Sequence, residues 1–126
     1  MKKRIFISFA IEDSKLRDFM VGQSRNSKIP FTFIDMSVKR PWDNSWKTNC
    51  RTKVKGCHGM IVLITSNTLR ASGELWEIKC AQEEEIPILF LWGNKIHSFS
   101  YVPSFVPFYK IKPWSWENIE KWIKSL

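Results

Sequence analysis

The chain has 126 residues, of which 44% are hydrophobic and 25% charged, so it can bury the core of a single domain spanning residues 1–126. The 14% share of aromatic residues excludes a largely disordered chain. The formal net charge of +8 indicates an anionic partner, either nucleic acid, a phosphorylated metabolite or a membrane surface. Charge alone does not choose among them.

The N-terminal residues, the apolar runs and the cysteines indicate where in the cell the protein is located. The basic residues 2–4 lead into only a short apolar segment before Glu12, and no apolar run approaches the roughly 20 residues that cross a bilayer. The three cysteines are odd in number and loosely spaced, which is typical of a reducing compartment. We therefore expect a cytoplasmic protein with neither a secretory signal nor a membrane partner.

The first third of the chain predicts two strands and a helix. Residues 5–9 are almost continuously apolar, as in a strand that is covered on both faces. Asp13 is then expected to cap a helix whose inner face carries Leu16, Phe19 and Met20. Residues 31–34 predict a second short strand, followed by a polar loop at 35–41.

The middle third predicts a strand between two helices. From Trp42 onward, residues of one predicted helical face recur every three or four positions: Trp42, Trp46, Cys50, Val54 and Cys57. Residues 60–64 form the clearest strand. Ser72 is expected to cap a third helix, with Glu74 placed favourably near the positive end of the helix dipole. That helix has five apolar positions: Leu75, Trp76, Ile78, Cys80 and Ala81.

The last third predicts a buried strand at 86–91, a short strand at 108–111 and a closing helix at 115–124, while 92–107 has no assignable pattern. Strands that alternate with helices indicate right-handed crossovers and a doubly wound parallel sheet. The expected fold is flavodoxin-like, with strand order 2-1-3-4-5. Ligands of such sheets bind beyond the carboxyl ends of the strands, at the switch point between strands one and three.

Several common kinds of functional site are excluded because their sequence motifs are absent. The five glycines are scattered, so neither a dinucleotide-binding turn nor a phosphate-binding loop is present. His58 and His97 are far apart, and Cys50, Cys57 and His58 do not match a zinc pattern, so no metal site is predicted. The hydrolase motif G-x-S-x-G is absent as well.

Three carboxylates remain at the predicted switch point. Glu77 interrupts an apolar run one turn into the third helix, so it can point toward the cleft, although a surface glutamate near a helix start is the simpler interpretation. Asp13 and Asp35 lie on the same rim, and each alone is most simply a cap or turn residue.

The basic residues of the second helix permit a phosphate or nucleic-acid contact, although a solvated helix face is the commoner explanation. They comprise Lys39, Arg40, Lys47, Arg51, Lys53 and Lys55. Trp46, Trp76 and Trp122 lie on apolar helix faces and are interpreted as packing residues. Trp42, beside Pro41, is kept as a candidate ligand contact.

Several sequence segments together resemble the TIR-like domains of bacteria, particularly the TIR-like subunits of Thoeris antiphage defence. They lie between Lys3 and Leu91 and comprise residues 4–10 with Glu12, Asp13, Leu16 and Arg17, residues 30–37, Pro41, Trp42 and Trp46, residues 59–64, and residues 75–81. The loop after the second strand lacks the Arg-Asp-x-x-Pro-Gly pattern of animal adaptor TIR domains, and Trp76 directly precedes Glu77.

The resemblance implies an enzyme that releases nicotinamide from NAD and joins the ADP-ribose into a cyclic or conjugated messenger, which activates a separate effector. Glu77 occupies the place of the family's essential glutamate and would stabilise the oxocarbenium-like ribose. NAD is then the substrate, with no further cofactor, and a homo-oligomer is left open. The resemblance places eight residues around the substrate: Ser8, Phe9, Ala10, Asp35, Met36, Ser37, Trp42 and Trp46.

Two alternatives stay open. A noncatalytic TIR-like scaffold would bind a protein partner through its helix faces and would not need Glu77. A small nucleic-acid binder would use the positive charge and the aromatic residues, and its affinity would fall steeply with salt. We rank the NAD-cleaving enzyme first, with low basal activity if infection or assembly is the trigger, and nucleic acid last.

Overall fold

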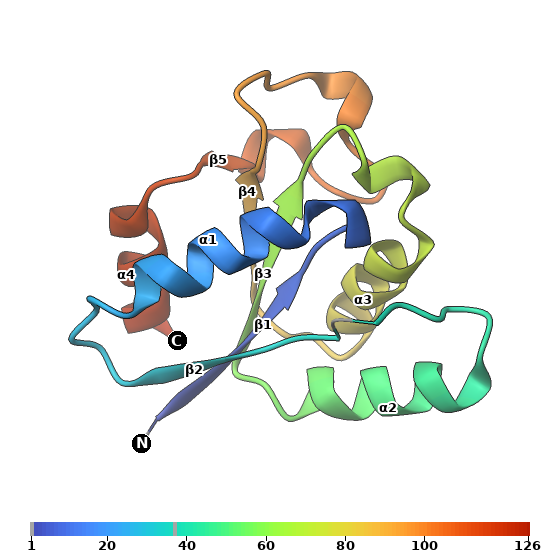
Figure 1. Ribbon diagram of the computed structural model, residues 1–126, viewed down its shortest axis with the longest axis horizontal. Coiled ribbons are helices and arrows are strands. Elements are labelled where there is room, and N and C mark those ends of the chain that lie inside the picture. Colours follow the sequence, from blue (N-terminus) through green and yellow to red (C-terminus); the bar gives the residue numbers. More distant parts are fainter. Residues whose placement is uncertain (1, 37) are drawn as a thin grey trace.

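The computed structural model describes residues 2–36 and 38–126, which form a five-stranded, all-parallel sheet with helices on both faces (Figure 1). The strand order is β2-β1-β3-β4-β5, as predicted for a flavodoxin-like fold. The strands are β1 (Lys3–Ser8), β2 (Phe31–Ile34), β3 (Gly59–Ile64), β4 (Ile88–Trp92) and β5 (Lys112–Pro113). The helices are α1 (Ser14–Ser24), α2 (Asn44–Lys55), α3 (Ser72–Glu83) and α4 (Trp116–Ser125).

The two central strands owe their burial to their apolar sequences. All six residues of β3 are buried, and β1 is buried from Ile5 to Ser8. In the parallel register Ile5 lies beside Gly59 and Ser8 beside Val62. Ser8 is therefore a hydroxyl-bearing residue at the carboxyl end of a strand that is otherwise apolar, which is where ligands of this fold bind.

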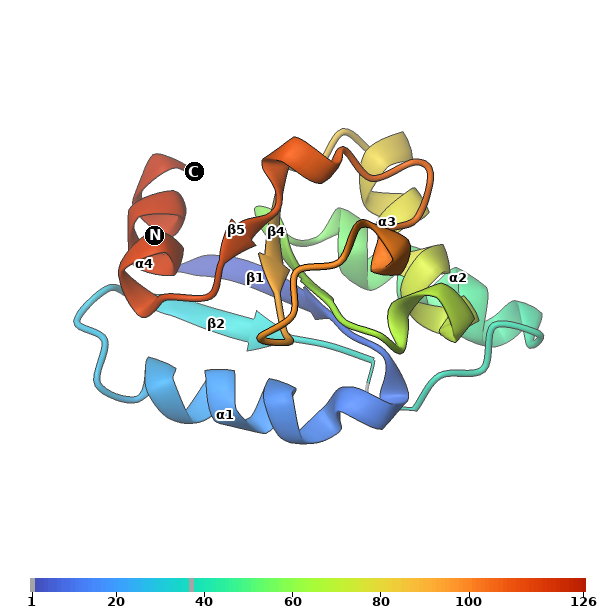
Figure 2. The same cartoon turned by 90° about the horizontal axis from the view of Figure 1, so that it is seen from above.

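Alternate residues of each strand supply two separate cores, one on each face of the sheet. Figure 2 shows α1 and α4 on one side and α2 and α3 on the other. The first core contains Ile5, Ile7, Phe9, Met20 and Ile119 among others. The second core includes Phe6, Trp46, Cys50, Val54 and Ile78. The three cysteines are buried and unbonded.

Two expectations for α1 were wrong. Asp13 does not cap the helix with its side chain, because the carboxylate accepts hydrogen bonds from Thr65 Oγ1 at 2.5 Å and Asn67 Nδ2 at 2.9 Å instead. The side chain thus fastens α1 to the loop after β3. Phe19 is 61% exposed and lies against Trp114 at the edge of the fold, so only Leu16 and Met20 of the predicted stripe face inward.

The predicted starts of α2 and α3 also need correction. Asp43 caps α2, because its carboxylate accepts from the backbone N–H groups of Ser45 and Trp46. The helix therefore begins at Asn44, which leaves Trp42 outside it and 78% exposed. Ser72 is the first residue of α3 and not its cap; the cap position is Ala71, which has no side-chain hydrogen bond to offer.

At the C-terminal end, the strand predicted at 108–111 is wrong. Phe108–Lys110 is a 3-10 turn, and the strand lies just beyond it at Lys112–Pro113. It pairs only with Leu91 and Trp92, because Pro113 has no N–H with which to continue the ladder. The strand predicted from residue 86 begins at Ile88.

The unassigned segment 92–107 contains the 3-10 turn Phe99–Tyr101, and Val106 anchors the segment in the core of the α2–α3 face.

No helix within residues 2–36 and 38–126 combines the length and the apolar character needed to cross a membrane.

Candidate functional site

The candidate site is centred on Glu77, whose carboxylate is held where β1 and β3 end. Glu77 lies in the second turn of α3, and its side chain has no exposed surface. The Ser8 hydroxyl, at the end of β1, donates a hydrogen bond of 2.8 Å to Glu77 Oε1. The crossover from β3 to α3 therefore places the carboxylate at the predicted switch point, but turned into the protein.

The second oxygen of this carboxylate is paired with Lys39, from the loop that follows β2. Lys39 Nζ lies 2.7 Å from Glu77 Oε2, and the lysine side chain is only 6% exposed. The same ammonium lies 4.2 Å from the centroid of the Phe9 ring, within the range of a cation–π interaction. A carboxylate and an aromatic face thus enclose one buried cation.

Gly73 makes this approach of the loop possible. A Cβ atom at position 73 would lie 2.8 Å from Lys39 Cβ, closer than side-chain contacts allow. Trp46 fixes the loop from the other side, because its indole Nε1 donates a hydrogen bond of 2.6 Å to the carbonyl of Val38. Residues of α2 and α3 therefore determine together where Lys39 lies.

Burial dominates the electrostatics of Glu77. Loss of hydration raises the pKa of the Glu77 carboxyl to about 7, against the opposing effects of the Lys39 ammonium and the Ser8 hydroxyl. The two contacts favour the ionised carboxylate, and burial favours the protonated acid. Glu77 can therefore change its charge near neutral pH.

A second buried acid, Glu74, lies one turn earlier in α3. It is fully buried, and neither of its carboxylate oxygens has a hydrogen-bond partner among the described residues. Burial, and next the charge of Glu77, raise the pKa of Glu74 well above its usual value of 4.5. This shift favours the neutral form of Glu74 beside an ionised Glu77, which avoids two adjacent buried charges.

Asp35 forms a separate ion pair at the edge of the site. Arg17 Nη1 donates to Asp35 Oδ2 at 2.6 Å, with both side chains 19% exposed. The guanidinium carbon of Arg17 also lies 5.2 Å from the Phe9 ring centroid. Phe9 therefore contacts two cations, of which Lys39 is bound by Glu77 and Arg17 by Asp35.

An open hollow of about 430 Å³, which we call the outer hollow, lies beside residues 38–43. It is lined by Asp35, Met36, Val38, Arg40, Asp43, Ser45, Trp46, Asn49 and Lys53. Val38 and Arg40 face this hollow, whereas Lys39 between them reaches Glu77. The loop is therefore a wall between the hollow and the buried carboxylate.

The structure brings together only part of the predicted substrate set. Ser8 and Phe9 surround the Glu77–Lys39 pair, and Ala10 is buried directly after them. Asp35, Met36 and Trp46 line the outer hollow instead. Trp42 does not line it and points to solvent. Ser37, also predicted to line the substrate pocket, lies outside the described residues.

Neither Lys39 nor Glu74 was predicted as a site residue. Lys39 was expected with Arg40 on the second helix, but α2 begins at Asn44 and both residues lie in the loop before it. Glu74 precedes Glu77 by three residues and so shares its helix face, which was an available signal. The charge of Lys39 was noted as a possible phosphate contact, but nothing in the sequence indicated that it pairs with Glu77, since a lysine in a polar loop is normally at the surface. Within the part of the chain that the structure describes, no group of three or more His, Cys, Asp or Glu side chains could hold a metal ion.

Comparisons with known protein families and curated proteins give no indication of function. No protein-family model matches the chain, and no match was found among curated proteins. The molecule is thus defined by a flavodoxin-like parallel sheet and by one buried carboxylate–ammonium pair at the switch point of that sheet.

Proposed function

We propose that the protein cleaves the bond between nicotinamide and ribose in NAD, with Glu77 as the catalytic carboxylate. The observation that carries the proposal is the position of the Lys39 ammonium, 2.7 Å from Glu77 Oε2 and 4.2 Å from the centre of the Phe9 ring. This cradle already holds a positive charge. A substrate whose reacting centre becomes cationic would find the same two stabilising groups.

NAD cleavage develops charge of this kind. The bond between ribose C1′ and the nicotinamide nitrogen breaks, its electron pair leaves with the nitrogen, and the ribose becomes oxocarbenium-like. Glu77 would stabilise that cation in a site from which water is largely excluded, where a carboxylate acts most strongly. Water or a second nucleophile then adds to C1′ and gives up its proton to solvent. Neutral nicotinamide needs little acid assistance, so one carboxylate suffices.

Access to Glu77 requires that Lys39 leave. The ammonium occupies the place that the ribose cation would take, so the conformation described is closed. Movement of the 38–40 segment would join the outer hollow to Glu77, and Arg40 and Lys53 on the hollow's wall would then meet the phosphates while Trp46 meets the adenine. A closed resting state agrees with low basal activity and an external trigger.

The larger setting follows from the resemblance to Thoeris subunits. The ADP-ribose product would be cyclised or conjugated into a messenger, and the messenger would activate a separate effector in the cytoplasm. The fold and the position of Glu77 on the helix after the third strand support this extension.

A noncatalytic scaffold is the second candidate, and one observation favours it. Glu77 has no exposed surface and both its oxygens are occupied, by Ser8 and Lys39. A purely structural ion pair would look the same. The scaffold predicts partner capture that survives Glu77→Gln.

The deciding experiment incubates purified protein with NAD, with and without lysate from infected cells, and identifies the products by mass spectrometry. Glu77→Gln should lower nicotinamide release by about 100-fold or more. Glu74→Gln is the matched control, because it makes the same change at another buried glutamate of the same helix, one that does not contact Lys39 or Ser8 through its carboxylate. Equal release by wild type and Glu77→Gln would remove Glu77 as the catalyst.

A further inference from the structure

A second, strongly basic hollow lies between α2 and α3, away from Glu77. It has a volume of about 400 Å³ and is lined by Asn44, Lys47, Thr48, Arg51, Thr52, Lys55 and Trp76. Trp76 and Glu77 are consecutive in α3, and their side chains therefore leave the helix about 100° apart. The hollow and the candidate active site are on different sides of that helix.

The cations of this hollow are regularly spaced along α2. Lys47, Arg51 and Lys55 follow one another at intervals of four residues, so they form a row with roughly 6 Å between successive positions. Like charges at this spacing destabilise an isolated helix. The lining contains no carboxylate, and neither Lys47 nor Lys55 has an ion-pair partner among the described residues.

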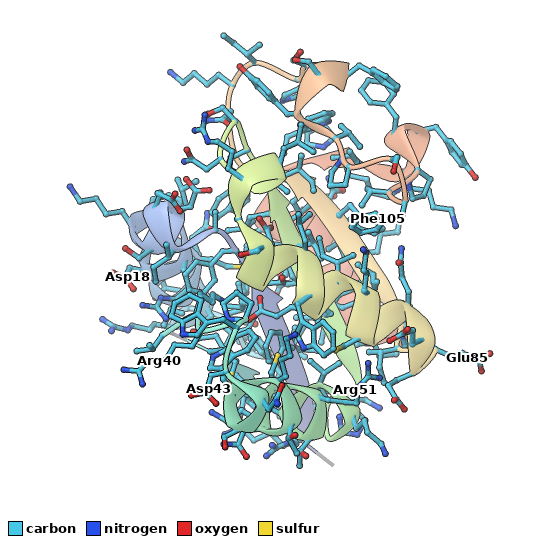
Figure 3. All side chains as sticks on the ribbon, turned by 90° about the vertical axis from the view of Figure 1, so that its right-hand side faces the viewer. Asp18, Arg40, Asp43, Arg51, Glu85 and Phe105 are labelled. Carbon is cyan, nitrogen blue, oxygen red and sulfur yellow. The ribbon has the colours of Figure 1, made fainter. Side chains whose placement is uncertain are left out.

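Arg51 is the one member of the row that is fixed in place. Its guanidinium donates to Glu83 at 2.6 Å and to Glu84 at 2.8 Å, at the end of α3. In Figure 3 Arg51 lies on the side of α2 that faces α3. Because these two carboxylates hold the guanidinium, its position over the hollow is set before any ligand arrives.

The half-buried indole of Trp76 forms the wall opposite the cations. Lys47 Nζ lies 5.1 Å and the Arg51 guanidinium carbon 5.6 Å from its ring centroid. A smaller hollow of about 340 Å³ also includes Lys47 and Trp76 and adds Lys79 and Ser72. The basic surface therefore continues around the indole from α2 to α3.

We propose that this surface is a binding site for phosphate groups carried by a nucleotide, separate from the candidate active site. The ammonium groups of Lys47 and Lys55 and the Thr48 hydroxyl suit the oxygens of a chain of phosphates. The Arg51 guanidinium, held by Glu83 and Glu84, lies between the two lysines. The indole offers an aromatic surface for the attached base. The volume fits a small ligand. The phosphates have two available sources, a free nucleoside polyphosphate or the backbone of a nucleic acid.

The test is calorimetric titration of the full chain with three probes: inorganic tripolyphosphate, ADP and a short single-stranded oligonucleotide. Lys47→Gln/Lys55→Gln should weaken the binding of every probe by about tenfold or more, since two charge-assisted contacts are lost. Lys15→Gln/Lys124→Gln removes the same charge from α1 and α4, on the other face of the sheet, and should change affinity less than about twofold.

The aromatic wall and the source of the phosphates are tested separately. Trp76→Leu should weaken ADP but leave tripolyphosphate unchanged, and Trp76→Phe should retain most of the ADP affinity. Tighter binding of ADP than of the oligonucleotide would identify a free nucleotide as the ligand; the reverse order would identify a nucleic acid. Equal affinities for the two double-lysine variants, or no binding of any probe at 50 mM salt, would overturn the proposal.

Discussion

Lys39 and Glu77 are 38 residues apart in the chain, and their charged groups meet at 2.7 Å in the interior of the protein. A buried ion pair is seldom a net source of stability, because both ions lose their hydration. Retaining one beside an aromatic ring and a strand-end hydroxyl is better explained by a need for the carboxylate itself.

The first prediction concerns the stability of the pair. Lys39→Met should lower the free energy of unfolding by about 3 kcal/mol at pH 8, because Glu77 is left as an unpaired buried anion. The loss should shrink at pH 5, where the carboxyl takes up a proton. Urea denaturation at the two pH values measures both quantities.

A double-mutant cycle with Glu77→Gln provides the control. The double variant should be more stable than the sum of the two single losses implies, by roughly 1–3 kcal/mol. Strictly additive losses would mean that the two side chains do not interact.

The second prediction concerns Glu74. Burial raises its pKa well above 4.5, so between pH 4.5 and its folded pKa the native state holds a proton that the unfolded chain has released. The contribution to stability is therefore complete below pH 4.5 and is lost as the pH rises through the folded pKa. Glu74→Gln has no such proton. As the pH rises from 5 to 9, the unfolding free energy of Glu74→Gln should therefore increase relative to that of wild type. Urea denaturation across this range measures the difference, and a constant difference would count against a neutral Glu74.

The third prediction is the pH dependence of NAD cleavage. The ionised form of Glu77 is the active one, and its pKa is raised to about 7. The value of kcat/KM should therefore rise with pH and level off above a midpoint near 7. Lys39→Met removes a group that lowers this pKa, so its midpoint should move to higher pH. A flat profile between pH 5 and pH 9 would argue that Glu77 does not titrate in the free enzyme.

The fourth prediction uses Gly73. A methyl group at this position would come within 2.8 Å of Lys39 Cβ, so Gly73→Ala should displace the loop and cost about 1–3 kcal/mol. It should also raise the basal rate of NAD cleavage, since the displaced lysine no longer occupies the cradle. Gly22→Ala is the matched control, because a Cβ there meets no atom within 4 Å. A stable Gly73→Ala protein with an unchanged basal rate would contradict the closing role of Lys39.

The sheet could be predicted from the sequence because its strands are apolar runs of the right length, and the order 2-1-3-4-5 follows from alternation with helices. Element boundaries that were predicted wrongly depend on local interactions of single residues. Asp43 caps α2 and thereby excludes Trp42, while Pro113 confines the last strand to two residues. Glu77 was placed correctly on α3, but its partner Lys39 could not be found because the contact joins that helix to the loop after β2, 38 residues earlier in the chain.

The most direct measurement is nicotinamide release from NAD at pH 9 by two proteins that lack the closing cation, Lys39→Met and Lys39→Met/Glu77→Gln. Removing Lys39 from both eliminates closure as the reason for inactivity. We expect Lys39→Met to release nicotinamide faster than wild type and the double variant to release almost none. Equal rates for the two variants would contradict the assignment of Glu77 as the group that breaks the glycosidic bond.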